Sequence, residues 1–171
     1  QSTRLLAHRL ELLGFSQKEK YNILVKVDLQ APDYPLTIQQ LVTTGSEAIF
    51  CADIAFHPTT QQLFGFDHKA GRLVTIDPKK GIVDNTFYPI LDDLSGNMPS
   101  LFFDPHGRLY GIAIPSSRQE SRRLYSFNIE NGASRELAYL GPESNQDACS
   151  CPFTVNLYQR VSLRKAFPCT A

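Results

Sequence analysis

Proline recurs at a fixed interval in this chain, and each time it follows a short segment of similar character. Pro58, Pro105 and Pro152 are spaced 47 residues apart. The segments before the first two match closely, with Ala52–Pro58 reading ADIAFHP and Pro99–Pro105 reading PSLFFDP. Self-similarity at a period of roughly 20 to 50 residues is the signature of repeat folds, in which one structural unit recurs along the chain. The spacing predicts three repeats of 47 residues each.

Two further motifs recur with the prolines. A triplet of leucine, an aromatic residue and glycine follows each of the first two, at Leu63–Gly65 and Leu109–Gly111. A strand-like alternation that ends in Asp or Asn occurs three times, at Leu24–Asp28, Leu73–Asp77 and Leu124–Asn128. Gly81 and Gly132 follow the second and third of these at equal distance. Glycine tolerates the positive φ of tight turns, so both segments are predicted to be hairpin connections.

Each repeat therefore contains four short extended pieces, namely the triplet, the alternating segment, a weaker third piece and the run that ends at proline. The third pieces are residues 38–42, 82–89 and 136–140. Four strands in a repeat of this length are typical of a β-propeller blade. The prediction is an all-β, β-propeller-like domain over residues 1–153. Its three repeats carry four short strands each, and a C-terminal extra strand lies in residues 154–171.

Two alternatives remain open at this point. A β-sandwich also has similar hairpins, because the chemistry of turns is repetitive, although the match through all four pieces favours the propeller-like fold. In the first copy, the opening strand is predicted either near Arg4–Leu6 or at Arg9–Gly14, and the latter also fits a short helix. Beyond residue 20 we expect no long helix.

The motifs together resemble the propeller-type repeats of secreted bacterial surface proteins. The resemblance rests on Asp53–Pro58, the Leu-aromatic-Gly triplets and Leu73–Gly81, and it covers roughly residues 20–155. In that family the array often precedes adhesin-like immunoglobulin-type modules, and residues 147–155 are similar to the junction where such arrays end. The resemblance implies extracellular or cell-surface residence and a binding or structural role. It supplies no catalytic residue.

The number of repeats departs from that family, whose arrays usually have more than three. The chain is therefore expected to be a fragment, to complete a ring with other copies, or to form an open stack. It begins with Gln1 rather than Met, which fits removal of a leader or a trimmed piece.

Composition excludes two classes of partner. Lys+Arg and Asp+Glu number 17 each, so the electrostatic reason to expect nucleic acid is missing. No apolar run reaches the roughly 18 to 20 residues that a membrane helix needs, and no membrane span is predicted. Hydrophobic residues make up 42% of the chain, which is enough for a folded core.

The four cysteines are Cys51, Cys149, Cys151 and Cys169. An even number, with three near the C-terminus, predicts disulfides formed in an oxidising compartment. A direct Cys149–Cys151 link would strain the bond geometry. We expect Cys51–Cys149 with Cys151–Cys169, or alternatively Cys51–Cys151 with Cys149–Cys169. Four free thiols are the remaining possibility.

Motifs for catalysis are missing from the sequence. There is no glycine-rich phosphate loop and no Gly-x-Ser-x-Gly segment, so no catalytic residue and no cofactor are predicted. The histidines are His8, His57, His68 and His106. Their spacing follows the repeat, which favours exposed turn residues on one rim over metal ligands, and no metal is predicted.

Three polar residues occupy one repeat position and are the candidate ligand-binding residues. They are Asp53, Ser100 and Asp147, spaced 47 residues apart. Equivalent side chains of propeller blades approach a common axis, where these three could bind a cation or a polar ligand. The alternative is that each satisfies backbone groups within its own blade.

The most direct prediction of function is a non-catalytic extracellular or cell-surface module for binding or assembly. One alternative is a propeller enzyme of the lactonase or hydrolase type with a metal in the central channel. Another is a lectin-like, glycan-binding propeller, which would need exposed aromatic residues at repeated positions, whereas Phe64, Tyr110 and Tyr125 are expected in the core. The loop at residues 116–123 carries arginines that could contact acidic saccharides or a partner protein.

The segment Thr154–Lys165 has the cleanest two-residue alternation in the chain. Val155, Leu157, Val161 and Leu163 fall on one side, as in a half-buried strand. An uncovered strand of this kind would promote association. We expect it to pair with another protein chain or another copy, with the N-terminal repeat, or to open a following immunoglobulin-type domain.

Overall fold

The protein is all-β in the part of the chain that the structure describes. The computed structural model describes residues 11–18, 21–28, 30–45, 48–115, 117 and 121–142. Apart from strands, these residues form one short 3-10 helix, Asp92–Leu94. The predicted absence of a long helix after residue 20 is confirmed there, and no helix in these ranges is long and apolar enough to cross a membrane.

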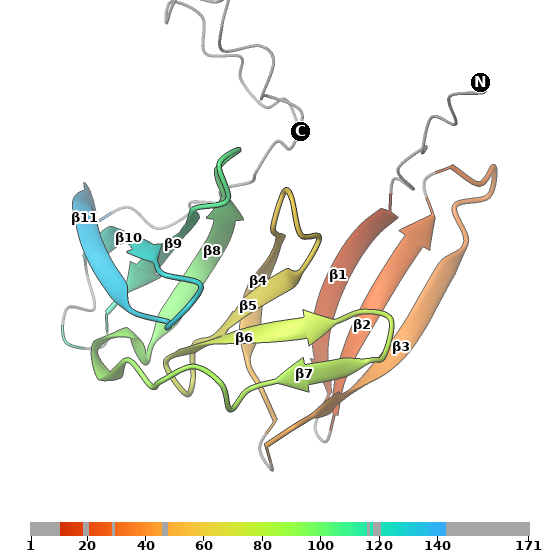
Figure 1. The fold of residues 1–171 in the computed structure, drawn as a ribbon, viewed down its shortest axis with the longest axis horizontal. Helices are drawn as coiled ribbons and strands as arrows, with labels where there is room; N and C mark the ends of the chain where they lie inside the picture. The colour runs from red at the N-terminus through yellow and green to blue at the C-terminus, as the bar shows by residue number, and fades with distance from the viewer. Residues whose placement is uncertain are drawn as a thin grey trace, which may run out of the picture.

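The strands form three consecutive groups, called here the first, second and third unit (Figure 1). The first unit comprises β1 (Glu11–Lys18), β2 (Tyr21–Asp28) and β3 (Leu36–Thr43). The second comprises β4 (Cys51–Phe56), β5 (Leu63–Asp67), β6 (Arg72–Asp77) and β7 (Ile82–Asp84). The third comprises β8 (Asn97–Phe103), β9 (Leu109–Ile114), β10 (Arg122–Phe127) and β11 (Ser134–Gly141). Successive strands within a unit are antiparallel neighbours.

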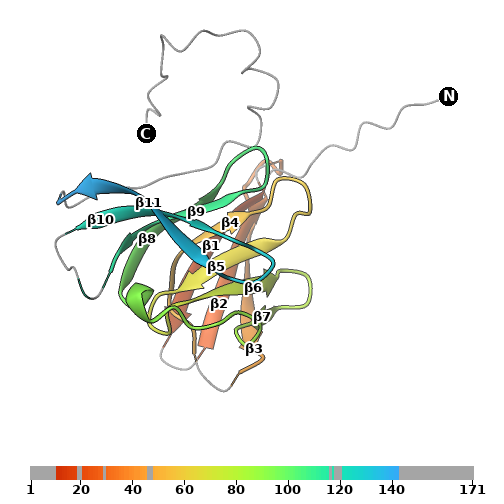
Figure 2. The ribbon, with the colours of Figure 1, turned by 60° about the vertical axis from the view of Figure 1, so that its left-hand side comes forward.

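The first two units share one curled sheet. A short parallel pairing of β3 with β7, through Val42 with Ile82 and Thr43 with Val83, joins them into seven strands. The third unit is a separate four-stranded sheet. The first strand of each unit also contacts the first strand of the next, because β1 contacts β4 and β4 contacts β8 (Figures 1 and 2).

The structure assigns most of the predicted pieces to strands. The triplets lie in β5 and β9, and the alternating segments lie in β2, β6 and β10. The short-helix alternative for Arg9–Gly14 is wrong from residue 11 onward, because β1 begins there and pairs with β2. The third piece at 82–89 is strand only to Asp84. The run that ends at proline was predicted as the last strand of a repeat. In the structure it is the first strand of the next unit, as β4 and β8.

One five-residue turn recurs at the end of three strands. Asp77 and Asn128 each accept backbone N–H bonds on their side-chain oxygen, and Gly81 and Gly132 have φ of 71° and 75°. Each glycine N–H in turn donates to the carbonyl oxygen of the Asp or Asn, at 2.9 and 2.7 Å. The β5–β6 turn has the same hydrogen bonds. The Asp67 side chain accepts the N–H of Lys69 and Ala70, and its carbonyl oxygen accepts the N–H of Gly71. The predicted hairpin connections are confirmed.

Hydrophobic side chains are buried between units rather than within them. Between the first and second units lie Leu24, Leu41, Ile49, Leu63, Val74, Ile76 and Val83. Between the second and third units, the cluster includes Ala55, Phe64, Phe66, Leu73, Leu101, Phe103, Leu109, Tyr125 and Phe127. A single layer of strands cannot bury its own apolar face, so each unit depends on its neighbour.

The glycine of the Leu-aromatic-Gly triplet has a packing reason. A Cβ at Gly65 would lie 2.9 Å from the Sγ of Cys51, and one at Gly111 would lie 2.9 Å from the Sδ of Met98. Real Cβ atoms do not approach other atoms so closely. Glycine at the end of the triplet therefore lets the first two strands of each four-stranded unit pack closely.

Candidate functional site

The predicted channel residues lie on neighbouring first strands. Asp53 is on β4 and Ser100 is on β8, and the Ser100 side chain is fully buried. Asp53 accepts hydrogen bonds from the backbone N–H of Ile54 and of Leu101, each at 2.8 Å. The second bond crosses to the next unit, whereas the sequence suggested partners within its own blade. Asp147 lies outside the described residues, and ligand binding by the three remains a prediction.

Three of the four histidines, His57, His68 and His106, lie in or beside turns, and His68 is half-buried. The Nδ1 of His57 accepts N–H bonds from Thr59 and Thr60 at 3.2 and 3.1 Å, and its ring packs edge-on against Phe103. His57 is half-buried, so the expectation of exposure is confirmed only for His106. His8 lies outside the described residues. Within those residues, no group of three or more His, Cys, Asp or Glu side chains could hold a metal ion.

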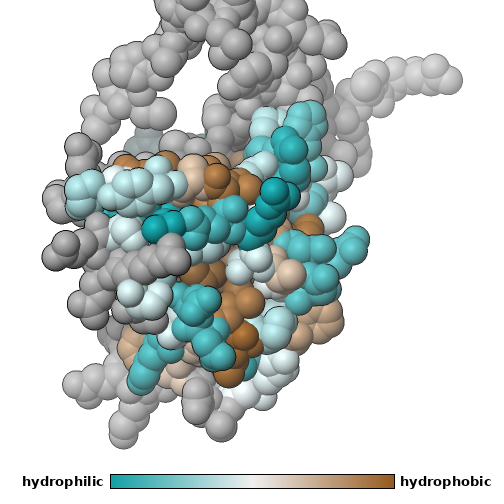
Figure 3. All heavy atoms as spheres, turned by 90° about the vertical axis from the view of Figure 1, so that its left-hand side faces the viewer, coloured by the Kyte–Doolittle hydropathy of each residue, from teal (hydrophilic) through white to brown (hydrophobic). Residues whose placement is uncertain are grey.

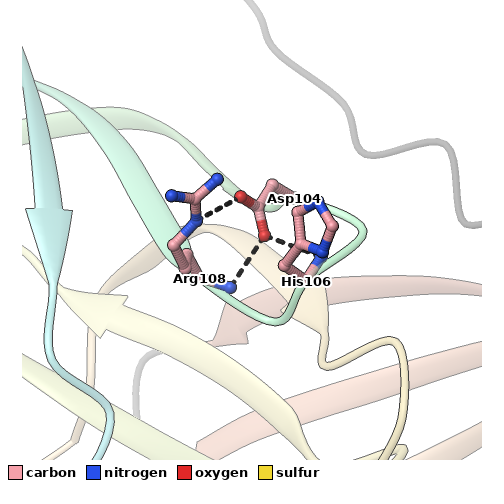
Figure 4. A network of polar contacts seen from close by, with 3 residues as sticks. All are labelled: Asp104, His106 and Arg108. Carbon is pink, nitrogen blue, oxygen red and sulfur yellow. Dashed lines mark hydrogen bonds and ion pairs between the residues drawn. The ribbon is translucent and has the colours of Figure 1, made fainter. Parts of the chain in front are cut away.

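The β8–β9 turn is closed by the carboxylate of Asp104 (Figure 4). Asp104 Oδ1 accepts the backbone N–H of His106 and of Arg108, both at 2.9 Å, and its Oδ2 lies 2.6 Å from Nε of Arg108. Burial alone would raise the pKa of Asp104, but the bonds from Arg108 and His106 outweigh it and hold this pKa below its usual value. Both oxygens of the Asp104 carboxylate thus accept hydrogen bonds within the turn, and the arrangement is structural.

This turn gives a pH-dependent prediction. Because the pKa of Asp104 is lower in the folded state, its stabilising effect is present above the unfolded pKa of about 3.9 and is lost as pH falls through the folded value. We expect Asp104→Asn to lower the free energy of unfolding by about 1 kcal/mol at pH 7. In urea titrations, the difference between the two proteins should shrink as pH falls below the unfolded value of about 3.9. A difference that stays constant down to the lowest pH at which both proteins fold would contradict this role.

Cys51 carries a free thiol in the structure. Its predicted partners, and Cys169, lie outside the described residues, so neither pairing of the predicted disulfides finds support. The thiol lies beside Gly65 on β5. Burial, and secondarily the Asp67 carboxylate, raises the pKa of Cys51 above its usual value.

A half-buried thiol of raised pKa should react slowly, because the thiolate is the nucleophile. In a variant with serine at the other three cysteines, we expect Cys51 to resist iodoacetamide at pH 8 until denaturant is added. Alkylation of Cys51 as fast as that of a free cysteine peptide would contradict the buried position. The mass of the untreated wild-type protein reports separately whether the four thiols are oxidised.

The features expected of a saccharide site are only partly present. Phe64 and Tyr125 are buried in the core between the second and third units, and Tyr110 alone of the three is half-buried. Arg123 forms an ion pair with Glu136 and lies over the ring of Tyr139, while Arg122 is buried. The repeated exposed aromatic residues that a glycan pocket in every unit requires are therefore missing at these positions.

An exposed apolar surface lies on the first unit and the adjoining edge of the second. It is called here the upstream face and consists of Val25, Val27, Leu36, Ile38, Val42 and Ile82. Leu36, Ile38 and Val42 on β3 are 59%, 62% and 64% exposed, and Ile82 on β7 is 39% exposed. Cross-strand pairing places Val25 opposite Ile38 and Val27 opposite Leu36. These side chains point away from the core, which Leu24 and Leu41 enter from the same two strands.

A second surface lies at the other end of the molecule, on the third unit. It is called here the downstream face and consists of Phe102, Tyr110, Ile114 and Leu124, which are half-buried, and Ile112, which is buried. These residues alternate with Leu101, Phe103, Leu109 and Tyr125, which are buried against the second unit. Phe102 and Tyr110 pair across β8 and β9, with their rings stacked at 5.6 Å.

The third unit is also hollowed beside this face. A cavity of about 650 Å³ is lined by Arg108, Tyr110, Ser126 and Arg135 together with the β10–β11 turn. Seen from that side, apolar side chains gather in patches separated and bordered by hydrophilic ones (Figure 3). The sequence carried a signal for both faces in its two-residue alternation, but alternation alone does not show which side of a strand a neighbour covers.

Comparison with known proteins adds little to this picture. No protein-family model and no curated protein matches the chain. Among solved structures, it is similar to a Bacteroides uniformis ATCC 8492 protein with the provisional name 6-phosphogluconolactonase, at 16% identity and a TM-score of 0.36. The match covers 74% of this chain and 41% of that one. A similarity of this size transfers neither fold nor activity to the present chain.

Proposed function

We propose that this protein is a non-catalytic module of β-propeller-like architecture that binds other proteins or builds an assembly. The upstream face carries this proposal. Monomeric proteins scatter exposed apolar residues singly, whereas a contiguous group marks an interaction site. Leu36, Ile38, Val42 and Ile82 form such a group on adjacent strands.

The arrangement of the units supports the propeller-like part of the proposal. The second and third units have the same order of four antiparallel strands, and their motif residues fall at the same positions in that order. The first strand of each unit contacts the first strand of the next, as neighbouring inner blade strands do in a propeller. Residence outside the cell is proposed on the resemblance to secreted surface repeats alone.

Energetics favour a partner over solvent on the upstream face. Fully burying one Leu, Ile or Val side chain contributes about 1.5 to 3 kcal/mol. Leu36, Ile38, Val42 and Ile82 are 39 to 64% exposed, so burying the rest of them contributes roughly half of that, on the order of 3 to 7 kcal/mol in all. Micromolar affinity corresponds to about 8 kcal/mol, and association has its own entropic cost. The exposed apolar side chains on β3 would otherwise be an association hazard for the isolated protein.

Site-specific photocrosslinking tests the proposal. A benzoylphenylalanine is placed at Ile38, on the upstream face, or at Phe87, which is equally exposed in the β7–β8 connection. In the cells that make the protein, we expect position 38 to give a discrete adduct, identified by mass spectrometry, and position 87 to give none. Equal crosslinking at both positions, or none at position 38, would contradict an interaction through this face.

A further inference from the structure

We propose that the cavity in the third unit is a binding site for an anionic saccharide, that is, a sugar ring that carries a carboxylate or a phosphate group. This site is independent of the proposed function, because it shares no residue with the upstream face. Its basis is the solvent-open cavity, the two arginines that line it, and an equivalent cavity in the second unit that lacks both arginines.

The cavity lies at one end of the third unit. Its wall consists of the β8–β9 turn, the β10–β11 turn and the adjoining ends of β9, β10 and β11. Its volume of about 650 Å³ lies within the range of roughly 300 to 1000 Å³ that small-molecule sites occupy. Unlike the half-buried downstream face beside it, this end carries exposed side chains at Arg108, Asn128, Glu130 and Arg135.

Two guanidinium groups line the cavity, and both have N–H donors to offer a ligand. Arg108 bonds to Asp104 through Nε at 2.6 Å, which holds its side chain in place beside the turn (Figure 4). Within the described part of the chain, the terminal nitrogens of Arg108 donate no hydrogen bond and Arg135 has no ion-pair partner. A guanidinium presents five donors in a planar fork that fits a carboxylate or a phosphate.

The opposing negative charges are few and are placed away from these donors. Both oxygens of Asp104 already accept hydrogen bonds within their own turn. Glu130 is the one acidic residue among those that line the cavity, and it lies on the exposed β10–β11 turn. An anion is therefore the ligand that the two arginines favour.

The rest of the wall suits the hydroxyl groups and the ring of a sugar. Tyr110, Ser126 and Arg135 pair directly across β9, β10 and β11, so they form one row along the cavity. The row is about 10 Å long, because neighbouring strands lie about 4.8 Å apart. The Tyr110 ring, which Phe102 supports by stacking, offers an apolar surface with a polar tip. Ser126 and Asn128 add side-chain donors and acceptors, as sugar hydroxyls require.

The second unit has a cavity at the equivalent place, of about 320 Å³. The equivalent residues are Gln62 for Arg108, Thr75 for Ser126 and Asp84 for Arg135. The first pair follows from the turns, where each carbonyl oxygen accepts at 2.9 Å the N–H of the residue that opens the turn. The other two pairs follow from the register of the last two strands of each unit. The cavity thus recurs with the unit, whereas the two arginines belong to the third unit alone.

Calorimetric titration of the purified chain tests the proposal. The probes are glucuronate and glucose 1-phosphate, with glucose as the sugar without a charge and acetate as the anion without a ring. We expect one of the two anionic sugars to bind at least 10-fold more tightly than glucose and acetate, and the tighter one identifies the acidic group. Equal affinity for glucose would overturn recognition of the charge. Equal affinity for acetate would overturn recognition of the sugar, and no binding of either anionic sugar at millimolar concentration would overturn the site.

Two variants locate the binding. Arg108→Gln introduces the side chain that the second unit has at this position, and Arg135→Gln removes the other charge. Each should weaken binding by about 10-fold or more, because a charge-assisted hydrogen bond is lost. Lys80→Gln, at a side chain that is 73% exposed on the second unit, removes the same charge elsewhere and should leave the affinity unchanged. Affinity that survives both arginine substitutions would overturn the proposal.

Amide chemical shifts of the wild type give a readout that does not depend on any variant. On addition of the anionic sugar, the amide signals of Ser126 and Arg135 should move, while those of the equivalent Thr75 and Asp84 should not. Equal shifts in both units would overturn the assignment to the third unit. Crosslinking at Ile38 reports separately on the upstream face, so failure of either proposal leaves the other standing.

Discussion

Phe103→Ala is expected to lower the free energy of unfolding by about 3 to 5 kcal/mol, the largest effect that we predict for a single substitution. Phe103 is buried where the second and third units meet, and its ring contacts those of His57 and Phe64 at 5.1 and 5.4 Å. Alanine would leave a cavity that strands from two sheets cannot easily close. The midpoint of thermal unfolding should fall by on the order of 10 °C.

The neighbouring residue offers a matched control. Phe102 lies on the same strand, but its ring is half-buried on the downstream face beside Tyr110. Phe102→Ala removes the same number of atoms, and at protein concentrations where the chain is monomeric it should cost less than half as much. Equal losses for the two substitutions would show that the third unit is not packed against the second as described.

Asp53→Ala is expected to cost about 2 to 3 kcal/mol. Its carboxylate accepts N–H bonds from Ile54 and from Leu101, so it links β4 to the first strand of the next unit. Without it, two backbone donors lose a charged acceptor. Asp53→Asn keeps one carbonyl oxygen and should cost less, which chemical denaturation of the three proteins would measure.

The same variants address the predicted ligand site at Asp53, Ser100 and Asp147. If the Asp53 carboxylate acts only through these backbone bonds, adding Ca²⁺ should leave the unfolding midpoint of the wild type unchanged. A calcium-dependent rise in the wild type that Asp53→Asn abolishes would contradict a purely structural role and favour an ion site.

Local structure could be predicted where a backbone conformation favours one residue type. Gly81 and Gly132 indicated turns because only glycine adopts positive φ without strain, and the structure has them at 71° and 75°. The Leu-aromatic-Gly triplets and alternating segments likewise correspond to strands. The strand boundaries of the third piece were less accurate, since β7 ends at Asp84.

Relations between strands were not predictable from spacing. The repeat period does not say that β3 pairs with β7 in parallel, nor that Asp53 bonds to the following unit. It also does not show that Ile38 is exposed while Leu41, three residues later on the same strand, is buried. Each of these depends on which surface a neighbour covers, and that is a property of the packed units.

Several predictions fall on residues that the structure does not describe. They include the pairing strand Thr154–Lys165, the channel residue Asp147 and three of the four cysteines. The boundary between residues 1–153 and 154–171 lies there too. These stay predictions.

Footprinting with a photoactivated carbene tests the central claim, that the upstream face is an interaction surface, most directly. The label is measured by mass spectrometry at Leu36, Ile38, Val42 and Ile82, with the exposed Phe87 and Ile90 as internal references. In the cells that make the protein, labelling of the four upstream residues should be several-fold lower, relative to the references, than in the purified protein at a concentration where it is monomeric. The same relative labelling at all six residues in both samples would contradict an interface at this face.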